Sequence, residues 1–300
     1  MKDYVELADG RRFGLATYGA STGHPVLALH GAPASRIMFD VTDTAAKKLG
    51  LRILCPERPG YGITKMDDAP SLASRASDLE HIANCLGLGR FSILGVSGGG
   101  PYAVALAERI GDRVLGMALV SPLGPLVEFR ENRLDGNVDK ELGRLSLRQK
   151  LFFLELPKHP HMLEIQASMS AHAFRAAPQS FASLFSRFLT EADTRVLAQD
   201  DVRESLIAMT LEAIRPGVAG GVADLTIYSK PWNIDYQRVD QPTIIWQGTS
   251  DGIVPPPATL WLASRLPNCR LETLKGAGHF WVYDHVDEIL EALAGLSRRS

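Results

Sequence analysis

The hydrophobic residues of the first 120 positions form short continuous runs that are separated by turn residues. Such runs occupy residues 25–29, 51–55, 91–96 and 114–120. Strands that are buried on both faces need apolar side chains at successive positions, so these runs predict a parallel sheet. Nearer the N-terminus, the Asp-Gly pair at residues 9–10 separates strand-like runs at 5–7 and 12–18. This pair predicts a hairpin, because it tolerates the positive φ angles of a tight turn.

Helical patterns alternate with these runs. Leu79, Ile82, Ala83 and Leu86 recur at the spacing of one helix face, and Gly87 follows as a stop signal. The alternation predicts right-handed crossovers and an α/β fold with a doubly wound, mostly parallel sheet of about eight strands. The same rhythm returns near the C-terminus, with strand-like runs at 243–247 and 270–274, a helix around 258–266 and a final helix from about His285.

The stretch between these two parts has a different pattern. From residue 122 to 232 the apolar positions, rich in Phe, Leu and Met, show helical periodicity and no buried strand. We therefore expect a core built from residues 1–121 and 233–300, interrupted by a helical insertion at residues 122–232. The length of this insertion is within the usual range for a domain.

Composition and charge exclude several classes of protein. The 300 residues are 45% apolar and 22% charged, which is ordinary for a globular enzyme and wrong for a disordered chain. The formal net charge of −2 predicts no general attraction to nucleic acid or anionic membranes. No apolar run approaches the roughly eighteen residues that span a bilayer. The first residues carry acids and lack the apolar stretch of a signal peptide, so we expect a cytoplasmic protein.

The three cysteines, Cys55, Cys85 and Cys269, are odd in number and far apart in the sequence. They therefore predict neither a disulfide framework nor a zinc site, and we expect reduced, buried thiols. His159 and His161 lie two residues apart without acidic or cysteine neighbours, which is too little for a metal site. We expect no metal.

The best candidate for chemistry is Ser97. Residues 95–99 read Gly-Val-Ser-Gly-Gly and match G-x-S-x-G between a predicted strand and a predicted helix. A sharp turn there exposes the serine hydroxyl, and the small residues let strand and helix approach each other. The N-terminus of the following helix adds backbone N–H donors and a positive dipole end, which suit a developing oxyanion.

A competing interpretation of the same glycines is a dinucleotide-binding loop. Gly98, Gly100 and Ala103 fit the pattern G-x-G-x-x-G/A. That pattern needs an acidic residue at the end of the next strand to bind ribose. The next strand ends Ala-Leu-Val-Ser-Pro at residues 118–122 and offers none. We therefore expect no cofactor.

The serine needs a base, and the base needs a carboxylate that fixes its tautomer. His279 lies just beyond the last predicted strand, and Asp251 follows the strand at 243–247. Loops at the carboxyl ends of parallel strands converge on one crevice, and the order Ser, Asp, His is typical of this arrangement. His285 and Asp284 are the nearest alternatives, and we expect both to cap the final helix.

A developing oxyanion also needs a second backbone donor. His30, Gly31, Ala32 and Pro33 follow the strand at 25–29. Pro33 has no N–H, so Ala32 is the expected donor beside Gly98. We expect His30 and Gly31 to support this loop rather than to take part in the chemistry.

These motifs together resemble the α/β-hydrolase superfamily over nearly the whole chain. The matching pieces are residues 30–33, 57–62, 95–99, 248–251 and 278–279. The resemblance implies an aspartate where this chain has Glu57, at a structural turn. It also implies that the insertion is a helical cap that covers the crevice. The related haloalkane dehalogenases and epoxide hydrolases carry an aspartate at the elbow, so Ser97 disfavours those activities.

The resemblance implies acyl chemistry. We expect a carboxylesterase-like enzyme that cleaves a small apolar or aryl ester through an acyl-enzyme on Ser97. Proline-iminopeptidase-like and carbon–carbon bond hydrolases share the constellation, although Ala32 and Ala34 depart from the glycine-rich loop of the former. An acyltransferase and a non-catalytic small-molecule receptor on the same fold are further alternatives. The sequence leaves the natural substrate and the formation of homo-oligomers open.

Overall fold

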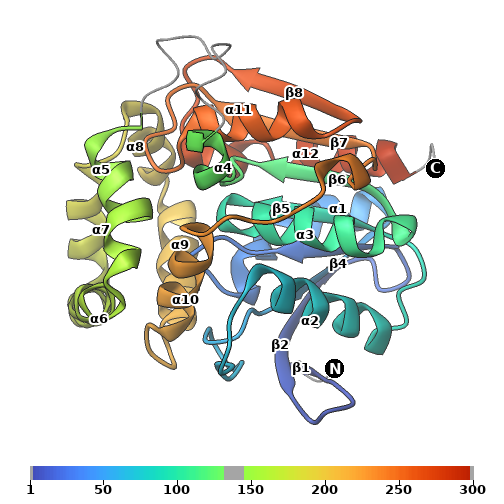
Figure 1. The fold of residues 1–300 in the computed structure, drawn as a ribbon, viewed down its shortest axis with the longest axis horizontal. Helices are drawn as coiled ribbons and strands as arrows, with labels where there is room; N and C mark the ends of the chain where they lie inside the picture. Colours follow the sequence, from blue (N-terminus) through green and yellow to red (C-terminus); the bar gives the residue numbers. More distant parts are fainter. Residues whose placement is uncertain (1–2, 132–144, 298–300) are drawn as a thin grey trace.

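The computed structural model describes residues 3–131 and 145–297 and is built around a sheet of order β1-β2-β4-β3-β5-β6-β7-β8 (Figure 1). The strands are β1 (Tyr4–Glu6), β2 (Arg12–Gly19), β3 (His24–Leu29), β4 (Leu51–Pro56), β5 (Phe91–Val96), β6 (Val114–Val120), β7 (Thr243–Gly248) and β8 (Cys269–Leu274). β1 pairs with β2 and β2 with β4 antiparallel, and every later pair is parallel. The expected mostly parallel sheet of about eight strands is confirmed.

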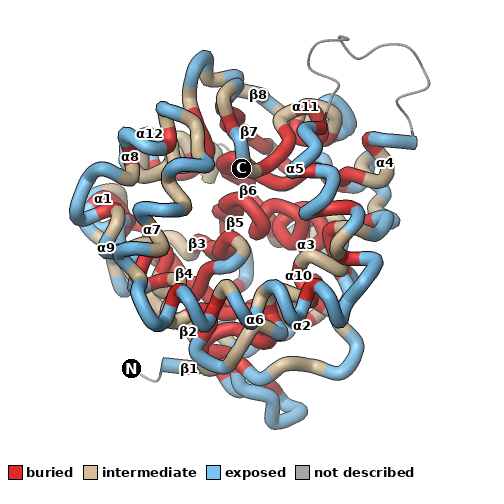
Figure 2. The backbone as a smooth tube through the Cα atoms, turned by 90° about the vertical axis from the view of Figure 1, so that its left-hand side faces the viewer, coloured by how far each residue is buried: buried red, intermediate tan, exposed pale blue. Residues whose placement is uncertain are grey.

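The central strands are buried on both faces, which explains their continuous apolar runs. In β6, Met117 and Leu119 face one hydrophobic cluster, while Ala118 and Val120 face the other. Side chains of successive strand residues point to opposite faces, so each strand contributes to both cores. Figure 2 shows the resulting buried centre of the molecule around β5, β6 and β7.

Helices cover both faces of this sheet. The first cluster packs against α2 (Leu72–Cys85), α3 (Gly100–Ile110) and α11 (Pro256–Arg265). The second packs against α1 (Asp43–Leu49) and α12 (Val286–Ser297). The sheet is therefore doubly wound, and the loops at the carboxyl ends of β3, β5, β7 and β8 meet at one edge, as in other sheets of this kind.

Between β6 and β7, the regular structure of the described residues is helical. The helices are α4 (Leu126–Glu131), α5 (Leu147–Lys150), α6 (Pro160–Ala176), α7 (Pro178–Ser186), α8 (Glu191–Leu197), α9 (Asp200–Ala213) and α10 (Ala219–Tyr228). In Figure 1, α5 to α10 lie together at the left of the sheet. Part of this stretch has a small core of its own, with Ala171, Phe174, Ile207 and Ile214. The division into core and cap stays a prediction, and residues 132–144 of the expected cap lie outside the described residues.

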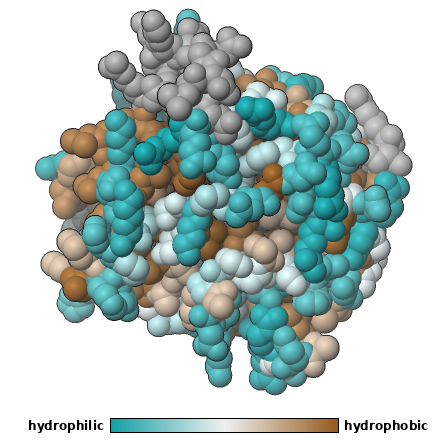
Figure 3. All heavy atoms as spheres, in the orientation of Figure 1, coloured by the Kyte–Doolittle hydropathy of each residue, from teal (hydrophilic) through white to brown (hydrophobic). Residues whose placement is uncertain are grey.

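The surface of these helices carries apolar side chains. Figure 3 shows hydrophobic atoms gathered on the left of the molecule, where α5 to α7 lie. The exposed large residues of this stretch are Leu147, Leu151, Phe152, Met162, Ile165, Met169, Leu184 and Phe188. None of the helices in the described part of the chain has the length and apolar character needed to cross a bilayer.

The expectation of three buried thiols is confirmed for Cys55 and wrong for Cys85 and Cys269. All three cysteines are free, but Cys85 is exposed and Cys269 is only half-buried. Cys85 is the last residue of α2, and a helix that covers a sheet turns one face to solvent. Burial raises the pKa of the Cys55 thiol well above 9 and that of Cys269 to about 11.

Candidate active site

Ser97 lies in a sharp turn between β5 and α3. Its backbone has a φ of 53°, a left-handed conformation that is costly for a non-glycine residue and occurs at functional turns. The turn is packed tightly, because a Cβ on Gly99 would overlap the carbonyl oxygen of Leu29. The side chain of Ser97 opens onto the cavity described below. The residue thus sits where a strand-to-helix elbow presents its hydroxyl.

The structure brings Ser97, His279 and Asp251 together although they are far apart in the sequence. His279 Nε2 is 3.0 Å from Ser97 Oγ, and His279 Nδ1 is 2.8 Å from Asp251 Oδ2. A carboxylate oxygen only accepts, so Nδ1 carries a proton and Nε2 is free to accept from the serine hydroxyl. This is the geometry that a general base needs.

The electrostatics of His279 favour its protonated form. Burial alone would lower its pKa, but the charge and hydrogen bond of Asp251, and then the charge of Asp193, outweigh burial and raise the pKa above 6.5. A base with a raised pKa takes a proton from a hydroxyl more readily. The same carboxylates stabilise the imidazolium that results.

Asp251 is held rigidly. Its Oδ1 accepts hydrogen bonds from the backbone N–H groups of Ile253 (2.9 Å) and Val254 (3.0 Å), and its Oδ2 also accepts from Gln247 Nε2 (3.3 Å). These bonds fix the carboxylate before any ligand arrives, which lowers the entropic cost of aligning His279.

The two alternatives lie elsewhere. Asp284 is exposed and accepts a hydrogen bond from Gln199. The ring of His285 stacks on Trp281 at 4.0 Å, and its Nδ1 donates to the Trp281 carbonyl oxygen. Neither contacts Ser97. Both lie at the turn before α12.

The loop at residues 30–33 lies beside the elbow. A Cβ on Gly31 would lie 3.4 Å from Ser97 Cβ, and Ala32 and Gly98 line the same cavity as Ser97. His30 is fully buried behind the loop: its Nδ1 is 2.8 Å from the Gly31 carbonyl oxygen, and its Nε2 accepts from the backbone N–H of Arg58 (3.1 Å). Burial, and then the charge of Arg58, lower the pKa of His30 well below 6.5.

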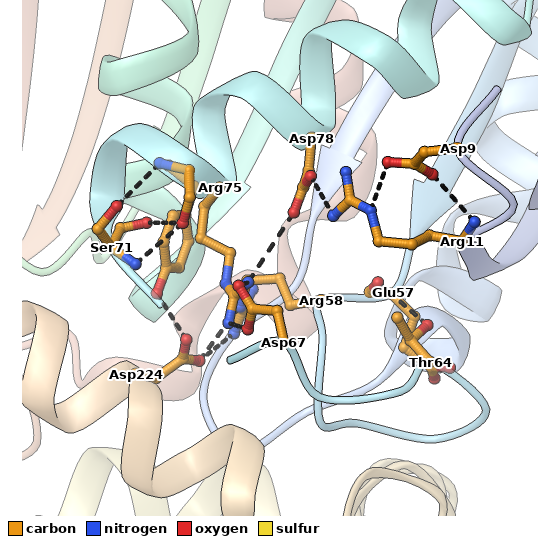
Figure 4. Close-up of polar contacts among 12 residues, drawn as sticks. Asp9, Arg11, Glu57, Arg58, Thr64, Asp67, Ser71, Arg75, Asp78 and Asp224 are labelled. Atoms are coloured by element: carbon orange, nitrogen blue, oxygen red, sulfur yellow. Dashed lines mark hydrogen bonds and ion pairs between the residues drawn. The ribbon is translucent and has the colours of Figure 1, made fainter. Parts of the chain in front are cut away.

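A buried ion pair ties this loop to α10. Arg58 donates to the carbonyl oxygens of His30 (2.5 Å) and Gly31 (2.7 Å), and also to Asp224 Oδ2 (2.7 Å). Figure 4 shows Asp224 pointing from its helix to the Arg58 guanidinium. Tyr61 and Tyr102 also donate to the Asp224 carboxylate, at 2.8 and 2.5 Å. Every charge of this cluster is therefore paired and hydrogen-bonded, as buried charges must be.

Glu57 has a structural position. Its carboxylate, almost fully buried, accepts from Arg36 Nη1 (3.0 Å) and from the backbone N–H of Ile63 (2.8 Å). The longer acid thus closes the turn at residues 57–64 and does not contact Ser97 or His279.

A cavity of about 960 Å³ lies over the elbow, between the sheet edge and the helices after β6. This is at the upper end of the usual range for ligand pockets. Most of its lining is apolar and aromatic, and Ser97, His279, Ala32 and Gly98 reach its wall. Among the residues that the structure describes, no three histidine, cysteine or acidic side chains are grouped to hold a metal ion.

The sequence did not predict the contacts of three residues in this region, Asp193, Asp224 and Tyr228. Asp193 accepts a hydrogen bond from the backbone N–H of Phe280, beside His279, at 2.8 Å. Asp224 accepts a hydrogen bond from Arg58, and Tyr228 donates one to the Gly98 carbonyl oxygen. The only local signal was the sequence Thr-x-x-Asp at 190–193, which also predicts an ordinary helix N-cap. Asp224 and Tyr228 lie four residues apart on one face of α10, and nothing local distinguishes that face from core packing.

Comparison with known proteins places the chain among proteins of the alpha/beta hydrolase fold. The family model described as alpha/beta hydrolase fold matches residues 24–286. The chain is 26% identical over 286 residues to the 2-hydroxymuconate semialdehyde hydrolase of Pseudomonas putida, covering 94% of this chain and 89% of that protein. An alpha/beta hydrolase fold protein from Nakamurella multipartita aligns with a TM-score of 0.69 and 24% identity over 98% of both chains. An esterase from Exiguobacterium antarcticum aligns with a TM-score of 0.70 and 17% identity, over 99% of this chain and 100% of that one. Likeness at these identities establishes a shared fold.

Proposed function

The chain belongs to the alpha/beta hydrolase fold family, and from this premise we propose that it is a serine-dependent hydrolase of small-molecule carboxylic esters. In this proposal Ser97 is the nucleophile, His279 the general base and Asp251 the acid that orients it. The backbone N–H groups of Ala32 and Gly98 form the oxyanion hole, with His30 and Gly31 supporting the loop. The observation that carries the proposal is the contact chain Ser97 Oγ to His279 Nε2 (3.0 Å) and His279 Nδ1 to Asp251 Oδ2 (2.8 Å).

In the acylation step, Ser97 Oγ attacks the ester carbonyl carbon while its proton passes to His279 Nε2. The carbonyl oxygen becomes an oxyanion that accepts from Ala32 and Gly98. When the tetrahedral intermediate collapses, the bond to the alcohol oxygen breaks. That oxygen takes the proton from His279 and leaves as the alcohol.

In the deacylation step, water attacks the acyl-enzyme and gives one proton to His279 Nε2. The second tetrahedral intermediate breaks its bond to Ser97 Oγ, which takes the proton back. The carboxylic acid leaves, and the enzyme returns to its starting state. A donor to the oxyanion contributes about 3–4 kcal/mol to such a transition state.

The cavity supports a small apolar or aryl substrate. Its lining includes Phe152, Phe153, Phe181, Leu206 and Ile207 from the helices after β6. Burying apolar substrate surface there provides binding energy, at about 25 cal/mol for each Å² removed from water. We propose that these helices act as the cap that excludes bulk water from Ser97.

A second candidate function is hydrolysis of a carbon–carbon bond. The specific observation in its favour is the likeness to 2-hydroxymuconate semialdehyde hydrolase over 94% of the chain. The same three residues would serve both reactions, because both pass through an oxyanion next to the attacked carbon. The two functions are distinguished by the products from matched ester and ketone substrates.

The proposal is tested with p-nitrophenyl acetate and butyrate on the wild type and Ser97→Ala. The matched control is Ser264→Ala, which removes an exposed hydroxyl on α11 that donates to the Trp261 carbonyl oxygen of the same helix. We expect a loss of about a millionfold in kcat for Ser97→Ala and none for the control. Mass spectrometry of rapidly quenched wild type should show the acyl group on Ser97. Equal activity of Ser97→Ala and the wild type would refute the proposal.

A further inference from the structure

Asp193 is a buried acid on α8 that contacts the turn carrying His279. Its side chain is fully buried. Its Oδ1 accepts from the backbone N–H of Phe280 (2.8 Å), and its Oδ2 accepts from the hydroxyl of Thr190 (2.9 Å). The two hydrogen bonds join a helix of the segment after β6 to the turn that carries the base.

Gly278, the residue before His279, packs against the same carboxylate. A Cβ at position 278 would overlap the Asp193 carboxylate, so only glycine fits there without moving it. The carboxylate thus packs against the residue before His279 and hydrogen-bonds the residue after it. A contact on both sides of one residue restrains the backbone that aims its ring.

Leaving a carboxylate buried is costly unless it is well compensated. Burial, and to a lesser extent the charge of Asp251, raise the pKa of Asp193 above its ordinary value, although the hydrogen bonds of Phe280 and Thr190 and the charge of His279 act against this effect. Among the described residues, the charges that raise the pKa of His279 are those of Asp251, on the loop after β7, and Asp193, on α8. Asp193 is therefore placed to interact with the imidazolium.

We propose that Asp193 is a second, positioning carboxylate for the base: it holds the Gly278–Phe280 backbone and presents a negative charge to the His279 ring. This inference rests on the proposed function of Ser97 and His279. Asp251 acts directly through Nδ1, whereas Asp193 acts through the turn and through space. The base then depends on two acids, one on the loop after β7 and one on α8.

The test is the titration of the His279 ring by NMR, with the resonance assigned by its loss in His279→Gln. In the wild type we expect a pKa above 6.5, because both carboxylates favour the imidazolium. Asp193→Asn keeps a side-chain oxygen for the Phe280 N–H but removes the charge. It should lower the pKa of His279 by roughly one unit, as loss of a nearby charge does. The acid limb of kcat/KM should move by the same amount with little change in KM.

The matched control is Asp201→Asn, which removes one negative charge from an exposed position in the first turn of α9. It should leave the titration unchanged. Asp193→Ser, which retains a hydroxyl acceptor, serves if the asparagine variant does not fold, and should also lower the pKa. A wild-type pKa at or below 6.5, or an unchanged pKa in either folded variant, overturns the inference. The titration needs no turnover, so an inactive wild type with a shifted His279 would refute only the proposed function.

Discussion

The hydroxyl of Tyr228 donates a hydrogen bond of 2.8 Å to the carbonyl oxygen of Gly98, the residue that follows Ser97. Tyr228 is the last residue of α10, 130 positions further along the chain. Burial, and then the charge of Asp224, raise its pKa well above 10, so the hydroxyl keeps its proton and remains a donor. A helix of the segment after β6 thus restrains the residue whose N–H is the proposed oxyanion donor.

We expect Tyr228→Phe to lower kcat about fivefold to tenfold with little change in KM. A typical hydrogen bond contributes about 1 kcal/mol, and that amount in the transition state corresponds to such a factor. The measurement is steady-state kinetics on p-nitrophenyl butyrate.

The control is Tyr236→Phe, because the Tyr236 hydroxyl is buried yet makes no hydrogen bond within the described part of the chain. Its removal should leave kcat unchanged and should not destabilise the protein. Equal kcat values for Tyr228→Phe and Tyr236→Phe would show that the contact with Gly98 does not affect catalysis.

Asp224→Asn should destabilise the fold much more. It leaves the buried guanidinium of Arg58 without its counter-charge, and breaking one side of a buried pair typically costs about 3–5 kcal/mol. We also expect weaker activity, because Arg58 holds the carbonyl oxygens of His30 and Gly31. Urea unfolding followed by circular dichroism measures the first effect.

The comparison for Asp224 is Glu155→Gln, which breaks the exposed pair with Lys158. Solvent screens such a pair, so the unfolding midpoint of this variant should stay close to that of the wild type. A midpoint for Asp224→Asn equal to that of Glu155→Gln would contradict a structural role for the buried pair.

The sheet was predictable because the local sequence of each central strand reflects its burial on both faces. Residues 91–96 and 114–120 are apolar at nearly every position, with Ser92 the exception, because both faces of β5 and β6 are covered, and the structure has both strands at those bounds. The proximity of the candidate residues Ser97, Asp251 and His279 was predictable for a related reason. Each follows a strand of a parallel sheet, and the carboxyl ends of such strands converge.

The contacts of α8 and α10 were not predictable. Asp193, Asp224 and Tyr228 meet their partners across 87, 166 and 130 positions of sequence. Their helical periodicity fits any buried face, so pattern alone does not say what each acid touches. The sequence pattern also did not predict whether the last residue of a helix is buried, and Cys85 at the end of α2 is exposed.

The cavity predicts a preference for neutral esters. Two arginines reach its lining, but both have partners: Arg148 donates to the Phe188 carbonyl oxygen and lies over its ring, and Arg203 pairs with Asp200. A substrate carboxylate that is buried against the mostly apolar lining would lose its hydration, which is costly. We expect kcat/KM for p-nitrophenyl butyrate to exceed that for the p-nitrophenyl hemisuccinate at least about tenfold, an energy difference of about 1.4 kcal/mol.

The measurement is a series of p-nitrophenyl acetate, butyrate, hexanoate and hemisuccinate at one pH and ionic strength. Chain length separates apolar contact from charge, because the butyrate and hemisuccinate acyl chains have the same number of carbon atoms. Equal kcat/KM values for these two esters would contradict the proposal that an apolar cap covers Ser97.

His30 predicts how stability depends on pH. Its pKa in the folded protein is well below 6.5, first because of burial and second because of Arg58. In the unfolded chain it titrates near 6.5. As the pH falls below 6.5, the unfolded state therefore binds a proton that the folded state does not. One such proton lowers the free energy of unfolding by about 1.4 kcal/mol for each pH unit.

His279 acts in the opposite sense. Its pKa is raised, so its contribution to stability is fully present below pH 6.5 and is lost as the pH rises through the folded value. Comparison of the wild type with His30→Gln cancels this term, because both proteins contain His279. The free energy of unfolding should be measured with urea at pH 7.5, 6.5 and 5.5. Below pH 6.5 it should fall more steeply with pH in the wild type than in His30→Gln, and the difference in slope should correspond to the uptake of about one proton.

The exposed His161 on α6 provides the matched control, since His161→Gln should retain the wild-type dependence on pH. If His30→Gln and the wild type lost stability equally between pH 6.5 and 5.5, then His30 would be accepting a proton in the folded state. Its Nε2 could not then accept the Arg58 N–H, and the hydrogen bonds that hold residues 30–33 beside Ser97 would have to differ from those described.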